Sequence, residues 1–134
     1  MALTGGCQCG AVRYEVSGEP KHVALCHCSD CRKSAGAPVV AWAGFAEKDF
    51  RLTKGQATSF NSSAATVRNF CPVCGTGLFS TNQEMLPGLV DIQSATLDDP
   101  DALAPQAQIQ VADRIGWMAS AHTLLEFPRF PGMD

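Results

Sequence analysis

Apolar and polar positions alternate along most of this chain in short segments. In residues 12–16, Val12, Tyr14 and Val16 alternate with Arg13 and Glu15, the pattern of a half-buried strand. Turn-forming residues follow, and similar short segments recur further along the chain. The pattern predicts a chain made mostly of strands, with the further strands expected at residues 38–42, 50–52, 66–70, 77–79 and 89–92.

One short helix interrupts this pattern. Ser29 and Asp30 are good N-cap residues, and residues 32–35 provide one or two helical turns before Gly36, which favours a helix end. A long amphipathic helix is not expected, and Asp98-Asp99-Pro100-Asp101 is typical of a turn or a helix start. The segment 127–132 is expected to be an extended closing segment.

Length and composition limit the number of domains and the kinds of partner that we expect. The 134 residues predict a single domain, 1–134, and 46% hydrophobic with 17% charged residues indicate a globular chain. No run of about 18 apolar residues is present, and no secretion signal is apparent, so we expect a soluble, cytoplasmic protein without membrane contact. A net charge of −3 with scattered basic residues argues against a nucleic-acid partner.

The seven cysteines change this picture most. An odd number leaves one cysteine over in any disulfide framework, and a reducing compartment would not keep such pairs oxidised. The cysteines also occur in close groups one or two residues apart, at 7/9, 26/28/31 and 71/74. Such spacing suits metal chelation and is too tight for easy disulfides within a group, so we predict zinc.

Two of the groups complete one site. Cys71 and Cys74 lie three residues apart around a tight turn, and Cys7 and Cys9 point to the same side of an extended segment. Neither pair provides four ligands alone. Together Cys7, Cys9, Cys71 and Cys74 make the composition of a closed structural zinc site, whose loss is expected to unfold the chain.

The third group, Cys26, Cys28 and Cys31, provides only three thiolates. Cys26 and Cys28 end an apolar stretch in same-side register, and Cys31 lies in the first turn of the predicted helix. Three ligands leave a fourth position, which is typical of a catalytic zinc. Two alternatives stay open: a histidine, His22 or His122, closes the site, or the seven cysteines pair differently. His27 is expected to point away, between two same-side cysteines.

Few other residues carry candidate chemistry. Trp42, Phe45 and Trp117 are expected in the core or in a pocket wall, and His22 and His122 as ordinary surface or turn residues. Arg32 and Lys33, beside Cys31, are candidates for attracting carboxylates or are simply solvated.

The cysteine-bearing motifs resemble a known family. The elements are Gly6-Cys7-Gln8-Cys9-Gly10-Ala11-Val12-Arg13-Tyr14, Cys26-His27-Cys28-Ser29-Asp30-Cys31-Arg32-Lys33, Phe70-Cys71-Pro72-Val73-Cys74-Gly75 and Thr96-Leu97-Asp98-Asp99-Pro100. In this order they are similar to the glutathione-dependent formaldehyde-activating enzymes, also called the centromere-protein-V family.

The resemblance implies a mainly β fold of several small antiparallel sheets organised around a structural four-cysteine zinc. It implies two Zn²⁺ per chain, with Cys26, Cys28 and Cys31 holding the catalytic one. It also implies a carbon–sulfur lyase that condenses glutathione with formaldehyde to S-hydroxymethylglutathione. One departure is Gln108, where relatives often have a histidine in a Pro-x-x-His-Ile segment; it puts the specific reaction in question.

Three function classes follow from the cysteines. The first is a zinc-dependent enzyme in which a thiol such as glutathione enters the open position and attacks a small aldehyde. The second is a non-enzymatic, zinc-stabilised binding module, because knuckle-type sites often only build a fold. The third, ranked last, is redox or metal sensing through the middle group.

Overall fold

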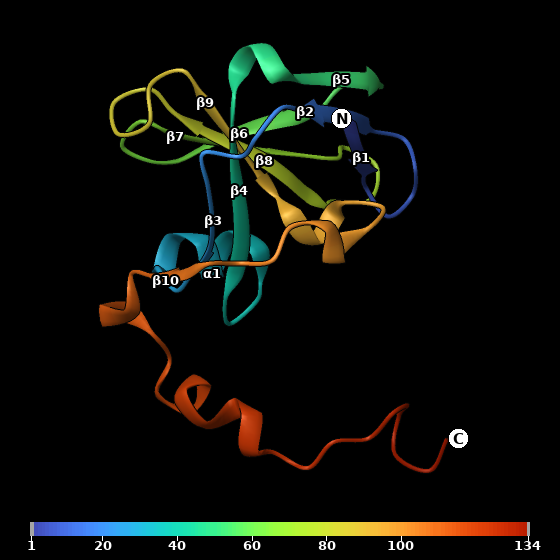
Figure 1. The fold of residues 1–134 in the computed structure, drawn as a ribbon, viewed down its shortest axis with the longest axis vertical. Coiled ribbons are helices and arrows are strands. Elements are labelled where there is room, and N and C mark those ends of the chain that lie inside the picture. The colour runs from blue at the N-terminus through green and yellow to red at the C-terminus, as the bar shows by residue number, and fades with distance from the viewer. Residues whose placement is uncertain (1, 134) are drawn as a thin grey trace.

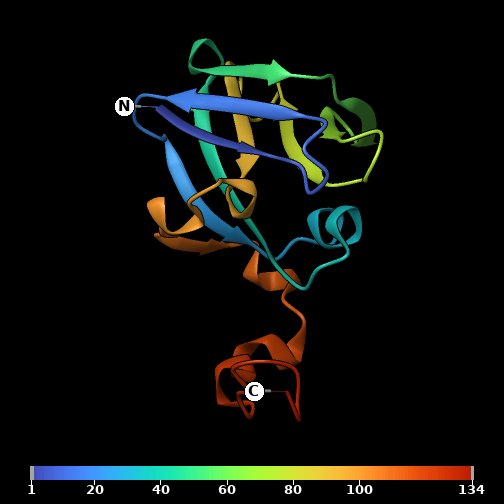
Figure 2. The same ribbon diagram turned by 90° about the vertical axis from the view of Figure 1, so that its right-hand side faces the viewer.

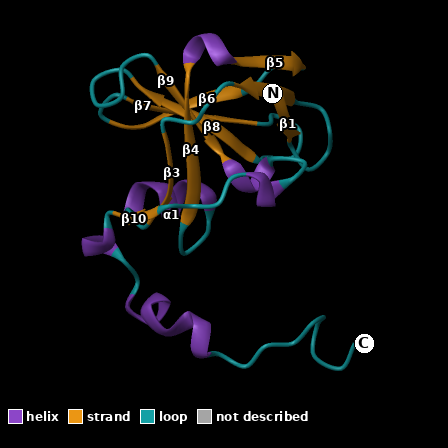
Figure 3. Cartoon of the chain, in the orientation of Figure 1, coloured by secondary structure: helices purple, strands orange, loops and turns teal. Residues whose placement is uncertain are grey.

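A computed structural model describes residues 2–133, and strands are the main regular secondary structure in it (Figures 1 and 3). The single α-helix, α1, spans Ser29–Ala35. The ten strands are β1 Ala2–Gly6, β2 Arg13–Ser17, β3 His22–Cys26, β4 Val40–Ala46, β5 Phe50–Lys54, β6 Thr58–Ser63, β7 Thr66–Phe70, β8 Gly77–Asn82, β9 Leu89–Gln93 and β10 Ala107–Ile109. Short 3₁₀ helices are η1 Glu47–Asp49, η2 Ser94–Thr96, η3 Pro100–Ala102, η4 Val111–Asp113 and η5 Gly116–Thr123.

The strands form two sheets, as the prediction of a mainly β fold with one short helix required. A three-stranded sheet has the order β1-β2-β5, and a seven-stranded sheet has the order β10-β3-β4-β9-β8-β7-β6. The pairings are antiparallel except for β10, which runs parallel to β3 and covers its outer edge. The larger sheet is therefore more extensive than the small sheets expected.

The main core lies between the two sheets. In Figure 2 the strands of the small sheet (blue and green) lie across those of the large sheet. Tyr14 and Val16 of β2 and Phe45 and Ile92 of the large sheet are each at most 1% exposed. Alternation sends Val12, Tyr14 and Val16 to one side of their strand, so the period of two in the sequence produces this core directly.

The Thr96–Pro100 segment is fastened to the small sheet by side chains of β1 and β2. The Tyr14 hydroxyl and Thr96 Oγ1 are 2.8 Å apart, and Arg13 forms a two-point ion pair with Asp98. Gly5 lies where any Cβ would meet the Thr96 carbonyl oxygen at 2.6 Å. The motif at residues 6–14 and the motif at residues 96–100 are therefore in direct contact, although they are distant in sequence.

Several local expectations differ from the structure. Strand β3 ends at Cys26, and Cys28 itself, rather than Ser29 or Asp30, is the N-cap of α1. Gly36 ends the helix with a φ of 65°, as predicted. Trp42 and Phe45 are buried, whereas Trp117 is 60% exposed and belongs to no part of the core. The Cys28 thiol thus takes the place of the usual cap oxygen and accepts the Cys31 N–H.

Residues 111–133 do not close onto the sheets. They form 3₁₀ turns and irregular chain that extend away from the two sheets (Figure 1), so the predicted closing segment at 127–132 is wrong. Within residues 2–133, no helix has the length and apolar character needed to span a membrane.

The buried Tyr14 gives the fold a testable dependence on high pH. Burial raises the pKa of Tyr14 to about 12, against about 10 for a free tyrosine. The neutral phenol is thus favoured by folding, so its contribution is complete below pH 10 and is lost as the pH rises toward 12.

We expect Tyr14→Phe to be about 1 kcal/mol less stable at pH 7, because the hydrogen bond to Thr96 is lost. The wild type should lose about 2 kcal/mol between pH 10 and 12 that the variant retains. Urea unfolding checks both values. Because Tyr14 is the chain's one tyrosine, tyrosinate absorbance also reads its pKa directly, and a value near 10 would contradict the prediction.

Candidate functional site

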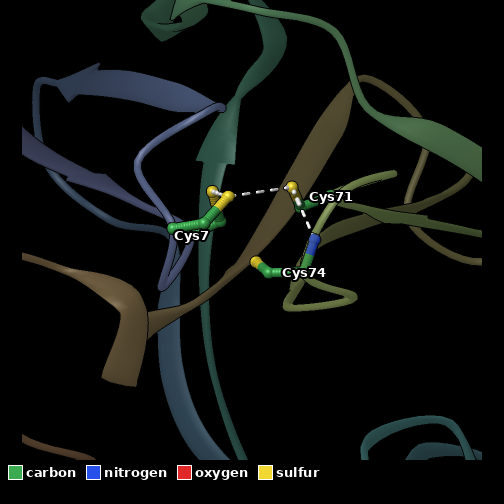
Figure 4. Close-up of side chains that lie close together, drawn as sticks. Cys7, Cys71 and Cys74 are labelled. Atoms are coloured by element: carbon green, nitrogen blue, oxygen red, sulfur yellow. Dashed lines mark hydrogen bonds between the residues drawn. The ribbon is translucent and has the colours of Figure 1, made fainter.

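The structure brings together the four cysteines predicted to share a metal. The loop between β1 and β2 carries Cys7 and Cys9, and the turn between β7 and β8 carries Cys71 and Cys74, with all four sulfur atoms within 4.8 Å of one another. Figure 4 shows the sulfur atoms of Cys7, Cys71 and Cys74 facing a common centre. The cluster therefore links the small sheet to the large one.

The sulfur spacing of this cluster fits a tetrahedral metal. Four sulfurs at about 2.3 Å from a zinc ion define edges of about 3.8 Å. The observed distances are 3.6 Å from Cys7 to Cys9 and 3.8 Å from Cys9 to Cys71. Backbone N–H groups also point at the sulfurs, from Val12 to Cys7 at 3.2 Å and from Val73 to Cys71 at 3.3 Å. Such donors stabilise thiolates, so the donor set suits zinc.

The middle group forms a second cluster at the junction of β3 and α1. The sulfurs of Cys26, Cys28 and Cys31 also lie within 4.8 Å of one another, with Cys26 and Cys31 buried. The Cys31 N–H donates to Cys28 Sγ at 3.3 Å, so the cap that starts the helix also orients a candidate ligand. In residues 2–133 no histidine or carboxylate joins these three thiols as a potential fourth ligand.

Arg68 is the main neighbour of this cluster that the sequence did not indicate. Its guanidinium lies 3.5 Å from Cys31 Sγ, donates to Asp30 at 2.6 Å and stacks over the Trp42 ring at 5.6 Å. Without a metal, hydrogen bonds from Cys26 first, and then from Cys28 and Arg68, lower the pKa of Cys31 to about 5. The same interaction with Cys31, together with burial, raises the pKa of Cys26. The cluster therefore holds at least one thiolate at neutral pH.

A cavity of about 560 Å³ opens beside the three thiols. It lies on the face of the large sheet opposite the small sheet, and its size is ordinary for a small-molecule site. Trp42, Ala24 and Val23 contribute apolar wall, and Met85 and Leu86 lie along another side. The three thiols, the Arg68 cation and an apolar wall thus lie around one open cavity.

The end of the cavity away from the thiols carries a hydrogen-bonded histidine–carboxylate pair. His22 Nε2 lies 2.5 Å from Asp91 Oδ1, and both residues line the cavity. Burial raises the pKa of Asp91, against the opposing effect of His22. Lys21 stands beside this pair.

Strand register explains how this pair forms. His22 of β3, Gly44 of β4 and Asp91 of β9 are direct neighbours across three strands, so their side chains share one face. Gly44 has no side chain, and a Cβ there would lie 2.3 Å from the His22 ring. The glycine therefore lets the imidazole reach over β4 to the carboxylate. The same row continues through Ser80 to Arg68.

The other sequence candidates fall outside the cavity. His122 is exposed in η5, and neither Arg32 nor Lys33 lines the cavity beside the thiols, a place that Arg68 takes. His27 is buried, with Nε2 at 2.8 Å from Gln108 Oε1, and its Nδ1 meets no hydrogen-bond partner in the described chain. Gln108 therefore contacts His27, the residue between the two candidate ligands Cys26 and Cys28.

These features define a β protein with two cysteine clusters fit for metal, one of them opening into a cavity. The sequence model of the family described as glutathione-dependent formaldehyde-activating enzyme matches residues 2–113. The chain belongs to this family, which confirms the resemblance seen in its cysteine motifs.

Individual relatives are more distant. A protein of Halomonas elongata described as a putative glutathione-dependent formaldehyde-activating enzyme is 34% identical over 87 residues, which cover 59% of this chain and 55% of that protein. The chain thus spans about half the length of this curated relative. A crystal structure of a Rhodobacter sphaeroides protein matches with a TM-score of 0.64 and 24% identity over 79% of this chain and 99% of that one, which shows a shared fold.

Gly44→Ala tests the arrangement of the His22–Asp91 pair. The new methyl group should displace the His22 ring and break its hydrogen bond to Asp91, which we expect to lower the free energy of unfolding by about 1–3 kcal/mol. Urea unfolding measures the loss, and NMR of the His22 ring shows the displacement. Gly116→Ala is the matched control, because a Cβ there meets open space; it should change stability by less than about 0.5 kcal/mol. Equal stability of the two variants would contradict the assigned role of Gly44.

Proposed function

We propose that this protein is a zinc-dependent enzyme of the carbon–sulfur lyase class that condenses glutathione with formaldehyde to S-hydroxymethylglutathione. The observation that carries the proposal is the cluster of three thiols that opens into a cavity of about 560 Å³. Membership of the formaldehyde-activating family supports the choice of substrates. Seven free cysteines also suit a reducing compartment such as the cytoplasm.

The two clusters would hold two zinc ions in different roles. Cys7, Cys9, Cys71 and Cys74 provide a full set of four ligands, suited to a structural ion. Cys26, Cys28 and Cys31 are proposed as the catalytic ligands, because they provide three and leave a coordination position facing the cavity. When bound there, zinc supplies a Lewis-acidic centre that favours the thiolate form of an entering thiol.

The residues around this cluster support that role. Arg68 places a positive charge next to Cys31 and offsets the accumulated negative charge of several thiolates. Asp30 and the ring of Trp42 hold the guanidinium in place. The apolar side chains of Ala24 and Trp42 line the cavity next to the thiols and reduce the contact of that wall with water.

The bond changes balance without an oxidant or reductant. The thiol sulfur forms a bond to the aldehyde carbon, and the electron pair of the carbonyl π bond moves to oxygen. The proton that the thiol released ends on that oxygen, which gives the hydroxymethyl group. The cavity would hold the thiol and the aldehyde in contact, and holding two reactants in contact is itself enough to accelerate their reaction.

Removing one ligand from each cluster separates the proposed roles. Cys31→Ser should lower the zinc content from about two per chain toward one and leave the fold intact, because the four-cysteine cluster is untouched. Cys74→Ser should lose the linking ion and unfold at markedly lower temperature. Metal analysis and circular dichroism measure both. If Cys31→Ser unfolds as severely as Cys74→Ser, the middle cluster is structural and the enzyme proposal loses its basis.

Entry of a thiol is tested with cobalt in place of zinc. Glutathione should add sulfur-to-cobalt charge-transfer absorbance that saturates at one equivalent per chain, and Cys31→Ser should abolish the change. An unchanged spectrum would favour the second candidate, a zinc-stabilised binding module.

A further inference from the structure

We propose that the Lys21–His22–Asp91 end of the cavity is a subsite for an amino-acid group, with its ammonium and carboxylate both charged, at the far end of the thiol substrate. The inference rests on the proposed function, because it assumes that the substrate's sulfur occupies the position beside the three thiols. The three thiols select only for a sulfur atom in the ligand. The subsite would add selection for a charged group at a fixed distance from that sulfur.

The two ends of the cavity are fixed by one strand. Residues 22, 24 and 26 of β3 point to the same side, so His22 and Cys26 face the cavity from opposite ends of the strand. Four residues of extended chain separate them by about 13 Å. A ligand with its sulfur near Cys26 reaches the pair only through a chain of several bonds.

The chemistry of the far end suits a group with both charges. Asp91 accepts a hydrogen bond from His22 at Oδ1, and its Oδ2 accepts none from residues 2–133. Its side chain is 14% exposed, so a carboxylate oxygen remains accessible in a mostly desolvated place. A carboxylate in this setting gains strongly from a cationic partner such as an ammonium.

Lys21 and His22 complete the subsite. The His22 side chain is 33% exposed, and Lys21 lines the same end of the cavity. The Lys21 ammonium is suited to the carboxylate of the same amino-acid group, while Asp91, held at Oδ1 by His22, takes its ammonium.

The wall between the two ends is mostly apolar. Ala24 and Trp42 lie between the thiols and the pair, and Met85 and Leu86 line the same space. Arg68, whose guanidinium lies beside Cys31, is the charged group of this wall at the thiol end. The cavity therefore fits a ligand with a charged amino-acid group at one end, a neutral link along Ala24 and Trp42, and a thiol at the other. A γ-linked peptide thiol meets this description. Free cysteine does not, since only two carbons separate its sulfur from its ammonium.

The subsite is tested with a ligand that has no thiol. S-methylglutathione keeps the amino-acid group and cannot enter as a thiolate, and its N-acetyl derivative lacks the ammonium. In calorimetric titration of the zinc-loaded protein, S-methylglutathione should bind at least about tenfold more tightly than the N-acetyl form, as expected for a charged hydrogen bond.

Variants assign the preference to residues. Asp91→Asn should weaken binding of S-methylglutathione by about tenfold or more and leave the N-acetyl form unchanged. Asp101→Asn, an exposed carboxylate in η3, is the matched control and should bind like the wild type. Equal binding of the two ligands by the wild type would overturn the proposal, as would an Asp91→Asn variant that weakens both equally. The wild-type comparison holds even if Asp91→Asn fails to fold.

The outcome is distinguishable from that of the proposed function. If S-methylglutathione shows the ammonium preference while the cobalt spectrum ignores glutathione, the subsite stands and the enzyme proposal falls. If the cobalt spectrum responds equally to glutathione and cysteine, and Asp91→Asn changes neither response, the subsite falls and thiol entry stands.

Discussion

The strands of the large sheet present alternate residues to opposite faces, so one face can form the core while the other lines the cavity. One face packs against the small sheet and holds the main core, with Phe45 and Ile92 fully covered. The other face lacks such a cover and carries Trp42, Asp91 and Arg68 along the cavity. A register slip of one residue would exchange the two sets, so core packing and the chemistry of the cavity are fixed by the same constraint.

The cysteine clusters were the part of the site most accessible from sequence. Ligands one to three residues apart are brought together by local backbone geometry, so Cys26, Cys28 and Cys31 could be grouped without knowing the fold. The long-range match of 7/9 with 71/74 followed from the need for four ligands, and the sulfur atoms do meet. Strand positions followed from alternation for similar local reasons.

The remaining site residues depend on contacts between distant strands. Arg68 is one of several basic residues in a sequence, and only the register that aligns β7 with β8 and β9 brings it to the thiols. The His22–Asp91 pair likewise needs two strand pairings and a glycine between them. Of the two places expected for Trp117, the core and a pocket wall, the structure shows the second, because this exposed side chain lines a surface hollow beside Arg32 and Lys33.

The absence of a side chain at Gly44 is required for the contact between His22 and Asp91. With any larger residue there, the ring of His22 is displaced from its position over β4, and the partly buried Asp91 carboxylate loses its hydrogen-bond partner. Positions 22, 44 and 91 should therefore vary together. Relatives that have another residue in place of the glycine should also lack the histidine and the acidic residue. Comparison of these three positions across the family would separate members that share the His22–Asp91 arrangement from members that have a different arrangement at this end of the cavity.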